Sequence, residues 1–322
     1  MKKTLLKMYH DLKESGSSSD FPNLLANTMY KILVDKFKGV SSPWAQYTAQ
    51  GDLADFKTAD RVIVSEAPDL LEIEEDGPYT DSKLTDRKYQ IALKTYGRTF
   101  SIGRRVIIND DLDAIRKQPA RFGRSSARTL VKKIVAALEG DSMSYDGNRL
   151  FSSAHNNVGN TSLTNDATGI AAVVAGMVRI AQSTEPDSGE KMGITAKYLM
   201  VPPELEDVAM RIINGTVYVP VSTSGGSNEP GMVRRLIPIV EPFLTSTTAW
   251  YILASPEDAP WCEVGFLNGK QTPDLLMKRA DTVNLAGGED PYGYEFDEIF
   301  YKVRHDWAIA TAMHQGIYRG KA

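Results

Sequence analysis

Cysteine is almost missing from this sequence, which has Cys262 alone among 322 residues. A single cysteine excludes an intrachain disulfide and a cysteine-cluster metal site, and it is typical of proteins from a reducing compartment. Apolar runs of about 18 residues are also missing, so we expect no membrane span. The start of the chain is basic and partly apolar, but its apolar run is broken by Lys7, His10 and Asp11, which argues against a signal peptide.

An excess of positive charge is missing as well. The chain has 37 Lys and Arg against 41 Asp and Glu, for a net charge of −4 and a pI near 5.7. A dedicated nucleic-acid-binding domain is usually basic, so this class is disfavoured, although contact with nucleic acid on one face stays open. Hydrophobic residues make up 42% of the chain, enough for a sizeable core and two subdomains.

Catalytic and metal-binding motifs are few. His305 is followed by Asp306, but neighbours on a strand point to opposite faces, and no G-x-S-x-G motif supplies a nucleophile. His155 stands near serines without an acidic third member, which favours a loop histidine bonded to backbone. No H-E-x-x-H or calcium-loop motif occurs. We therefore expect no catalytic residue, no cofactor and no metal site, while a small cytosolic hydrolase using His155 or His305 stays an alternative.

The most informative stretch is Ala120–Glu139. Its apolar residues recur at steps of three and four, which predicts one buried stripe on an amphipathic helix, consisting of Ala127, Leu130, Val131, Ile134, Val135 and Leu138. Pro119 is expected just before this helix and Gly140 as its left-handed cap. A separate short helix is predicted at Leu112–Lys117. An ordinary core helix explains this segment alone, but its flanks are unusual.

Residues 57–108 are rich in β-forming segments. Two strands are predicted, Arg61–Ser65 and Tyr89–Ile102, with turn-forming Glu-Asp-Gly-Pro between them. The excursion has few large apolar residues near its tip, so it cannot bury itself in its own subunit. Two interpretations follow: a mobile surface loop, or a long hairpin that becomes ordered against another copy of the chain.

An α/β unit is predicted from about 167 to 255. Helices are expected at Ala167–Ser183 and from Pro203 to a cap at Asn214–Gly215, with strands between and after them. The tail is predicted to contain two strands separated by a break at Asp306–Trp307, and to return to the first β region. The fold class is therefore α+β with a discontinuous subdomain, preceded by a helical arm in the first 55 residues.

Charges are unevenly distributed between these parts. The predicted hairpin tip is acidic, and the hairpin base and long helix are basic. We name as candidate contact residues between subunits Glu72, Glu74, Glu75, Asp76, Arg104, Arg105, Arg121 and Arg124. Two solvated faces explain the same pattern, because exposed ion pairs contribute little individually.

Five motifs in order resemble one known family. They are 96–104 (YGRTFSIGR), 146–151 with 153–155 (DGNRLF and SAH), 199–205 (LMVPPEL), 263–269 (EVGFLNG) and 301–306 (YKVRHD). Together with the order of parts they resemble the major capsid proteins of tailed bacteriophages, of HK97-like fold, and are most similar to the Mu-like major head subunit group. The resemblance covers about residues 90–322.

The resemblance implies an N-terminal arm at 1–56, an extended hairpin or E-loop at 57–98, a peripheral domain at 99–166 and 256–322 with Ala120–Glu139 as spine helix, and an axial domain at 167–255. It implies a structural protein that forms pentamers and hexamers of an icosahedral shell around double-stranded DNA. Such a protein would assemble in the host bacterial cytoplasm and reside in the virion.

The implied partners are further copies of the chain and DNA contacted non-specifically, with portal, scaffold, protease and cement proteins as further candidates and no membrane. An encapsulin-like shell around a cargo protein is the alternative of the same fold.

Overall fold

The computed structural model describes residues 20–40, 42–64, 72–73, 86–109, 112–186, 189–215, 231–278, 285, 292–293 and 295–321. The first 19 residues of the predicted helical arm and the tip residues Glu74, Glu75 and Asp76 lie outside these ranges. The chain divides into two compact units, which are described separately. Unit 1 takes its described residues from Met1–Ser41, Lys94–Leu130 and Lys270–Trp307, and unit 2 from Ser42–Leu93, Val131–Gly269 and Ala308–Ala322.

Unit 1 is built on a β-sheet covered by helices. Its elements are α2 (Asp20–Lys38), β4 (Lys94–Gly103), α4 (Arg104–Ile108), the first part of α5 (Leu112–Glu139), β10 (Asp274–Met277) and most of β11 (Glu298–Thr311). The strand β11 pairs antiparallel with β4 over ten residues and with β10 over four. Met29, Ile102, Ile299 and Tyr301 form a buried cluster there.

The long helix α5 is more continuous than its sequence predicts. Two helices separated before Pro119 were expected, but Pro119 lies inside one helix of 28 residues. Proline has a φ angle suited to a helix and removes only one backbone donor, so packing along the flanks can carry the helix through it. All six residues of the predicted apolar stripe are buried, which confirms the helical period.

Two backbone details complete α5. The left-handed residue after the helix is Asp141, with φ of 54°, whereas Gly140 was expected in that role. Inside the helix, Gly123 lies against α2, where an added Cβ would be 2.3 Å from the carbonyl oxygen of Leu33. Only glycine allows two helix backbones to approach this closely, so the α2–α5 contact is specified by Gly123.

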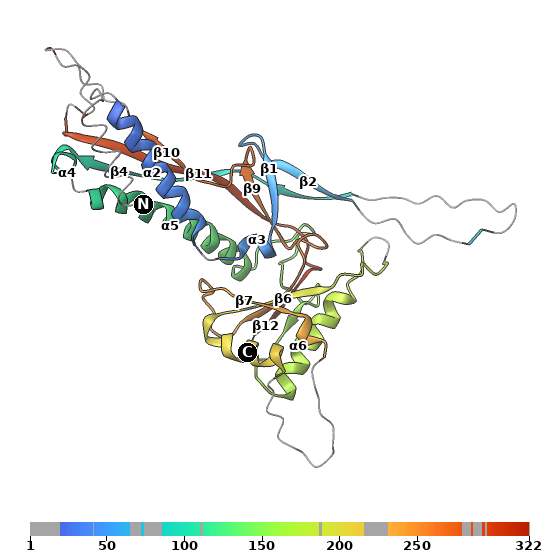
Figure 1. The fold of residues 1–322 in the computed structure, drawn as a ribbon. Helices are drawn as coiled ribbons and strands as arrows, with labels where there is room; N and C mark the ends of the chain where they lie inside the picture. The colour runs from blue at the N-terminus through green and yellow to red at the C-terminus, as the bar shows by residue number, and fades with distance from the viewer. Residues whose placement is uncertain are drawn as a thin grey trace. The chain divides into compact units, whose positions relative to one another are not determined.

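Unit 2 contains a five-stranded sheet with helices packed against it (Figure 1). Its strand order is β5 (Val158–Gly159), β12 (Ile317–Gly320), β8 (Trp250–Ala254), β6 (Ala196–Val201) and β7 (Ile237–Val240). The helices are α6 (Ala167–Ala181), α7 (Glu206–Asn214) and the short helices η1 (Pro203–Leu205) and η2 (Val233–Arg235). Both strands at the centre of this sheet, β6 and β8, are buried on both faces, and Gly215 caps α7 with φ of 71°, as predicted.

The chain termini differ from the prediction. No break occurs at Asp306–Trp307, because β11 continues to Thr311. As expected, β11 pairs with the first β region through β4, but the final strand β12 pairs with β8. Residues 44–53, which were included in the predicted helical arm, form the short helix α3 (Trp44–Tyr47) and the strand β1 (Ala49–Leu53). Strand β1 pairs in parallel with β9 (Cys262–Leu267), a pairing between distant segments that local periodicity does not reveal.

The predicted hairpin exists as β2 (Ala59–Val64) and β3 (Asp86–Ile91), paired antiparallel from Ala59 with Ile91 to Val64 with Asp86. The strand predicted over Tyr89–Ile102 is divided at 92–93 into β3 and β4. In the described part of the chain, β2 and β3 form a two-stranded sheet of their own. No helix in that part is both long and apolar enough to cross a bilayer.

Candidate functional site

The root of the β2–β3 hairpin is fixed by one buried carboxylate. Glu263 on β9 accepts a hydrogen bond of 2.5 Å from the Tyr89 hydroxyl and forms a 3.0 Å ion pair with Arg61. Arg61 also donates to the backbone oxygen of Asp52 at 2.8 Å. Burial, followed by the nearby Glu263 carboxylate, raises the pKa of Tyr89 above its usual range, so the phenol stays protonated and donates. The two hairpin strands are thereby attached to β1 and β9.

Beyond this root, the hairpin strands stay exposed within their own chain. Val62 on β2 is 57% exposed. The neighbouring residues Asp60 and Lys88 form an exposed ion pair at 3.0 Å, and Glu72 is exposed. The described strands therefore leave apolar and polar surface uncovered by their own subunit.

The predicted basic contact residues lie on the surface of unit 1. Arg104 is about half exposed, 3.8 Å from Asp297, and its guanidinium lies over the Tyr292 ring. Arg105 on α4 and both Arg121 and Arg124 on α5 are exposed. Their proposed partners Glu74, Glu75 and Asp76 lie outside the described residues, so the pairing between tip and base stays a prediction.

His305 has a serine partner that the sequence did not reveal. Its Nδ1 lies 3.1 Å from Ser126 Oγ on α5, and its Nε2 lies 3.0 Å from the Gln271 carbonyl. Asp306 instead accepts a hydrogen bond of 2.6 Å from Thr95, in agreement with the opposite faces expected of strand neighbours. Burial lowers the pKa of His305 to about 4. Such a ring is a weak proton acceptor at neutral pH, so the pair is poorly suited to activate a nucleophile.

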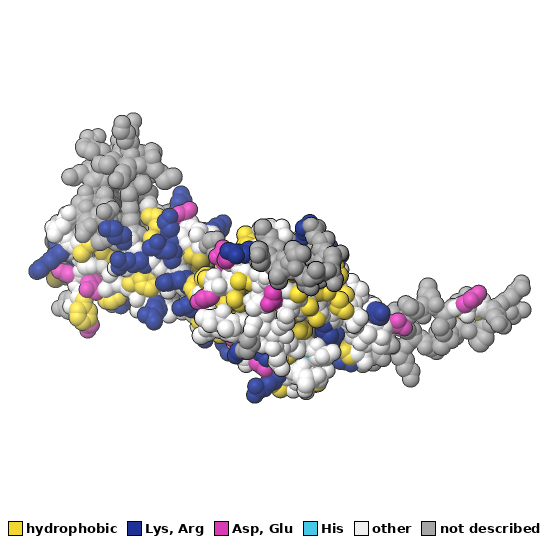
Figure 2. Space-filling view, turned by 90° about the horizontal axis from the view of Figure 1, so that it is seen from below, with side chains coloured by type: hydrophobic (Ala, Val, Ile, Leu, Met, Phe, Trp, Pro, Cys, Tyr) yellow, Lys and Arg dark blue, Asp and Glu magenta, His cyan; other side chains and the backbone are white. Residues whose placement is uncertain are grey.

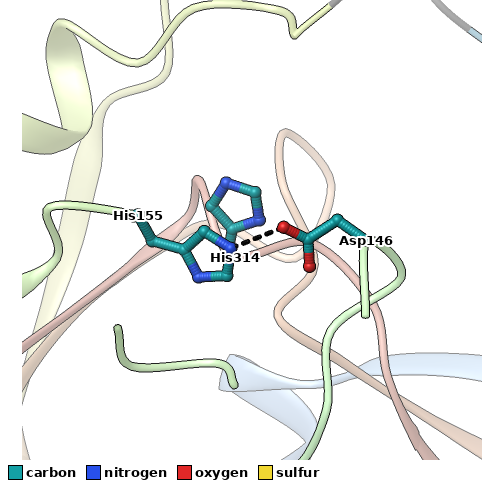
Figure 3. Close-up of side chains that lie close together, drawn as sticks. All are labelled: Asp146, His155 and His314. Atoms are coloured by element: carbon teal, nitrogen blue, oxygen red, sulfur yellow. Dashed lines mark hydrogen bonds and ion pairs between the residues drawn. The ribbon is translucent and has the colours of Figure 1, made fainter. Parts of the chain in front are cut away.

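His155 has the acidic partner that was predicted to be missing. Its Nε2 lies 2.7 Å from Asp146 Oδ2 (Figure 3), and its Nδ1 lies 3.1 Å from the Leu150 carbonyl. Both ring nitrogens therefore have a hydrogen-bond partner, one on a side chain and one on the backbone. Burial opposes the charge on Asp146, but hydrogen bonds from Asn148 and His155 outweigh it and lower the Asp146 pKa to about 2.

His314 completes this cluster, which no local sequence signal connects. Its ring stacks on that of His155, with centroids 3.6 Å apart and planes 6° apart. Burial, and then the charge of His155, lower the pKa of His314 to about 4. The ligand atoms of Asp146, His155 and His314 lie within 4.8 Å of one another, close enough to suggest a metal site.

The orientation of the two rings argues against shared metal coordination. An imidazole nitrogen binds a metal in the plane of its own ring, and two parallel rings separated by 3.6 Å do not direct their lone pairs to one point. Arg179 also donates to the His155 carbonyl at 2.5 Å, which places a further positive charge nearby. In this arrangement the cluster ties the 145–155 loop to the segment preceding β12.

Comparison with known proteins identifies the family. A sequence profile of the family described as "Phage capsid protein" matches residues 87–320, nearly three quarters of the chain. The chain belongs to the phage capsid protein family. A search of curated proteins finds no match.

Solved structures show the same fold at low sequence identity. The chain is similar to a structure from Microbacterium phage Oxtober96, with 10% identity, a TM-score of 0.56 and coverage of 87% of this chain and 90% of the other. The capsid of cyanophage P-SCSP1u is 9% identical, with a TM-score of 0.54 and coverage of 88% of each chain. The procapsid of bacteriophage JBD30 is 14% identical, with a TM-score of 0.50 and coverage of 95% of this chain and 76% of the other.

Family and fold together confirm the main predictions. The chain has an α+β, HK97-like capsid fold, and it is a major capsid protein, a structural component of the phage head that associates with copies of itself.

Proposed function

We propose that this capsid protein forms pentamers and hexamers of an icosahedral shell that encloses double-stranded phage DNA. The observation that supports this role is the β2–β3 hairpin, which is anchored at its root and exposed along both strands. Surface that one subunit leaves exposed can be buried by a neighbour, and closed symmetry repeats that contact many times. The shell would assemble in the host cytoplasm, and the resemblance of the five sequence motifs supports a relation to the Mu-like head subunits.

The parts of the chain would divide this work. Residues 1–56 would be an arm, 57–98 the hairpin that lies over a neighbour, and 167–255 the axial domain at the centre of each capsomer. The remaining residues, 99–166 and 256–322, would form the peripheral domain around α5. Portal, scaffold, protease and cement proteins are the further partners of such a shell.

The hairpin tip would be held by charge. Glu72, Glu74, Glu75 and Asp76 would pair with Arg104 and Arg105 of a neighbouring subunit. Arg104 is suited to this because it is exposed and its only described ion pair is a long one, 3.8 Å from Asp297. An individual exposed pair contributes only about 0.2–1 kcal/mol, so the contact would depend on its repetition around the shell.

A charge-reversal experiment tests the assembly role. The E74K/E75K variant should keep the unfolding free energy of the subunit and lose shell formation, measured by urea unfolding and by electron microscopy. The control E204K/E257K makes the same charge change at two exposed glutamates and should assemble. Adding R104E/R105E to E74K/E75K should restore shells. Normal shells from E74K/E75K would contradict the pairing, and a wild type that forms no shells would contradict the function.

The content of the shells distinguishes the two kinds of compartment. Purified shells containing DNA support the phage head, whereas shells filled with one cargo protein and no DNA would favour the encapsulin-like alternative. We also infer that the chain has no catalytic role, because the low pKa of His305 makes its contact with Ser126 a poor nucleophile–base pair.

A further inference from the structure

The exposed face of α5 carries an uninterrupted line of positive charge. No Asp or Glu occurs between Asp113 and Glu139. Four exposed basic residues recur there at steps of three, four and four, namely Arg121, Arg124, Arg128 and Lys132. At 100° per residue, this spacing places all four within an arc of about 80° that runs along one edge of the buried stripe. We call these four residues the α5 basic stripe.

The α5 basic stripe is not neutralised by described carboxylates. Within the described ranges, none of its members forms an ion pair with Asp or Glu. The adjoining apolar stripe of α5 is buried, so the helix cannot rotate to hide the charges. In Figure 2, Lys and Arg side chains gather at the left of the view with few acidic ones among them. The stripe is therefore a fixed surface that favours an anionic partner.

We propose that the α5 basic stripe binds the phosphate backbone of the packaged DNA. This inference rests on the proposed function, because it names where a DNA-filled shell would touch its contents. From Arg121 to Lys132 a helix rises about 16 Å, the axial length of about five phosphates on one strand. Three of the four residues are arginines, whose planar guanidinium groups bind phosphate in two-point contacts.

Net charge favours DNA as the partner of this stripe. The whole subunit has a net charge of −4, so a shell without a basic face would repel its DNA. A line of cations without base-reading elements neutralises phosphates of any sequence. The competing partner is the acidic hairpin tip of a neighbour, for which the sequence also offers Arg121 and Arg124. The two partners give different results in the experiment that follows.

The test compares two variants with the same change in net charge. R121Q/R124Q/R128Q removes three stripe cations, whereas K133Q/K191Q/K302Q removes three exposed lysines outside it. Lys133 is a strict control, because it lies on the same helix about 140° from Arg128. Binding of the unassembled subunit to two labelled 20-bp duplexes of different sequence is measured by fluorescence anisotropy over a range of NaCl concentrations, and shells are counted by electron microscopy.

We expect the stripe variant to bind both duplexes about tenfold or more weakly at low salt. The slope of log affinity against log salt should fall by about 0.9 for each arginine lost, while the control stays within about twofold of wild type. R121K/R124K/R128K should keep the slope, because it keeps the charge. If the triple variant does not fold, R124Q alone should lower the slope by about 0.9.

Three results would overturn the inference. Unchanged DNA binding by the stripe variant would do so, as would an equal loss in the control variant. Loss of shells in the stripe variant while the control assembles would show that the arginines hold subunits together instead. The failure of the proposed function is a separate observation, namely wild-type protein that forms no shells or shells without DNA.

Discussion

Helix α5 and the β2–β3 hairpin are both charged, elongated elements, and they are stabilised in opposite ways. One side of α5 is packed by six buried apolar residues, with Leu130 and Ile134 fully inaccessible. The hairpin is attached at its root through Glu263, Arg61 and Tyr89, and it exposes Val62. The helix therefore derives its stability from its own subunit, and the hairpin strands keep surface available for another one.

This difference assigns separate tasks to the two elements. A helix with a packed face presents its opposite face in a fixed orientation, which suits repeated contact with a regular partner. A two-stranded ribbon is marginally stable alone and gains from a surface that completes its burial. Substitutions in the two regions should therefore affect unfolding and assembly in different proportions.

The largest effect on stability is expected inside α5. Ile134→Ala should lower the unfolding free energy by about 3 kcal/mol, because it removes buried methyl groups and leaves a cavity. Urea unfolding measures this change, with Ala136→Ser on the exposed face of the same helix as control. A decrease in the unfolding free energy of less than about 1 kcal/mol would show that the apolar stripe of α5 is not part of a packed core.

Acid should destabilise the two packed units. The pKa of His305 and that of His314 are both lowered to about 4 in the fold, against about 6.5 in the unfolded chain. The folded state therefore binds fewer protons, so the stability present above pH 6.5 is lost as the pH falls toward 4. Between pH 6.5 and pH 5, each histidine should lower the unfolding free energy by about 2 kcal/mol.

Urea unfolding at a series of pH values checks this, and His314→Gln should reduce the slope. An unchanged slope would mean that the ring is protonated as easily in the folded state as in the unfolded state.

A smaller effect is expected at the hairpin root. Glu263→Gln removes the negative charge of the carboxylate to which Arg61 and Tyr89 both donate. It should lower the unfolding free energy by about 1–2 kcal/mol, because both donors lose a charged acceptor. Amide hydrogen exchange should accelerate in β3 and stay unchanged in α5. Glu257→Gln, at an exposed position, is the matched control. Equal exchange in β3 before and after the change would contradict the anchoring role.

The smallest effect on the subunit is expected at the exposed hairpin strand. Val62→Asp should change the unfolding free energy by no more than about 0.5 kcal/mol, since the side chain is 57% exposed. It should nevertheless reduce shell formation, because burying a new charge against a neighbour is unfavourable. Val62→Thr keeps a β-branched side chain and should assemble. Full assembly of Val62→Asp, seen by electron microscopy, would place this strand outside the interface.

Local periodicity by itself determined much of this protein. The spacing of apolar residues predicted the buried stripe of α5, the helix α6 and the hairpin strands, because each pattern repeats within a few neighbouring residues. The Asn214–Gly215 cap of α7 was predictable for the same reason, since a left-handed residue favours glycine wherever it occurs.

Only the tertiary structure decided which distant residues meet. His155 and His314 stack although 159 positions separate them. Ser126 meets His305 across 179 positions, and Arg61 meets Glu263 across 202. Pairing between strands placed β12 beside β8, and packing continued α5 through Pro119. These outcomes depend on the chain as a whole, because the free energy that selects them comes from burial and hydrogen bonds between segments that carry no mark of each other in the sequence.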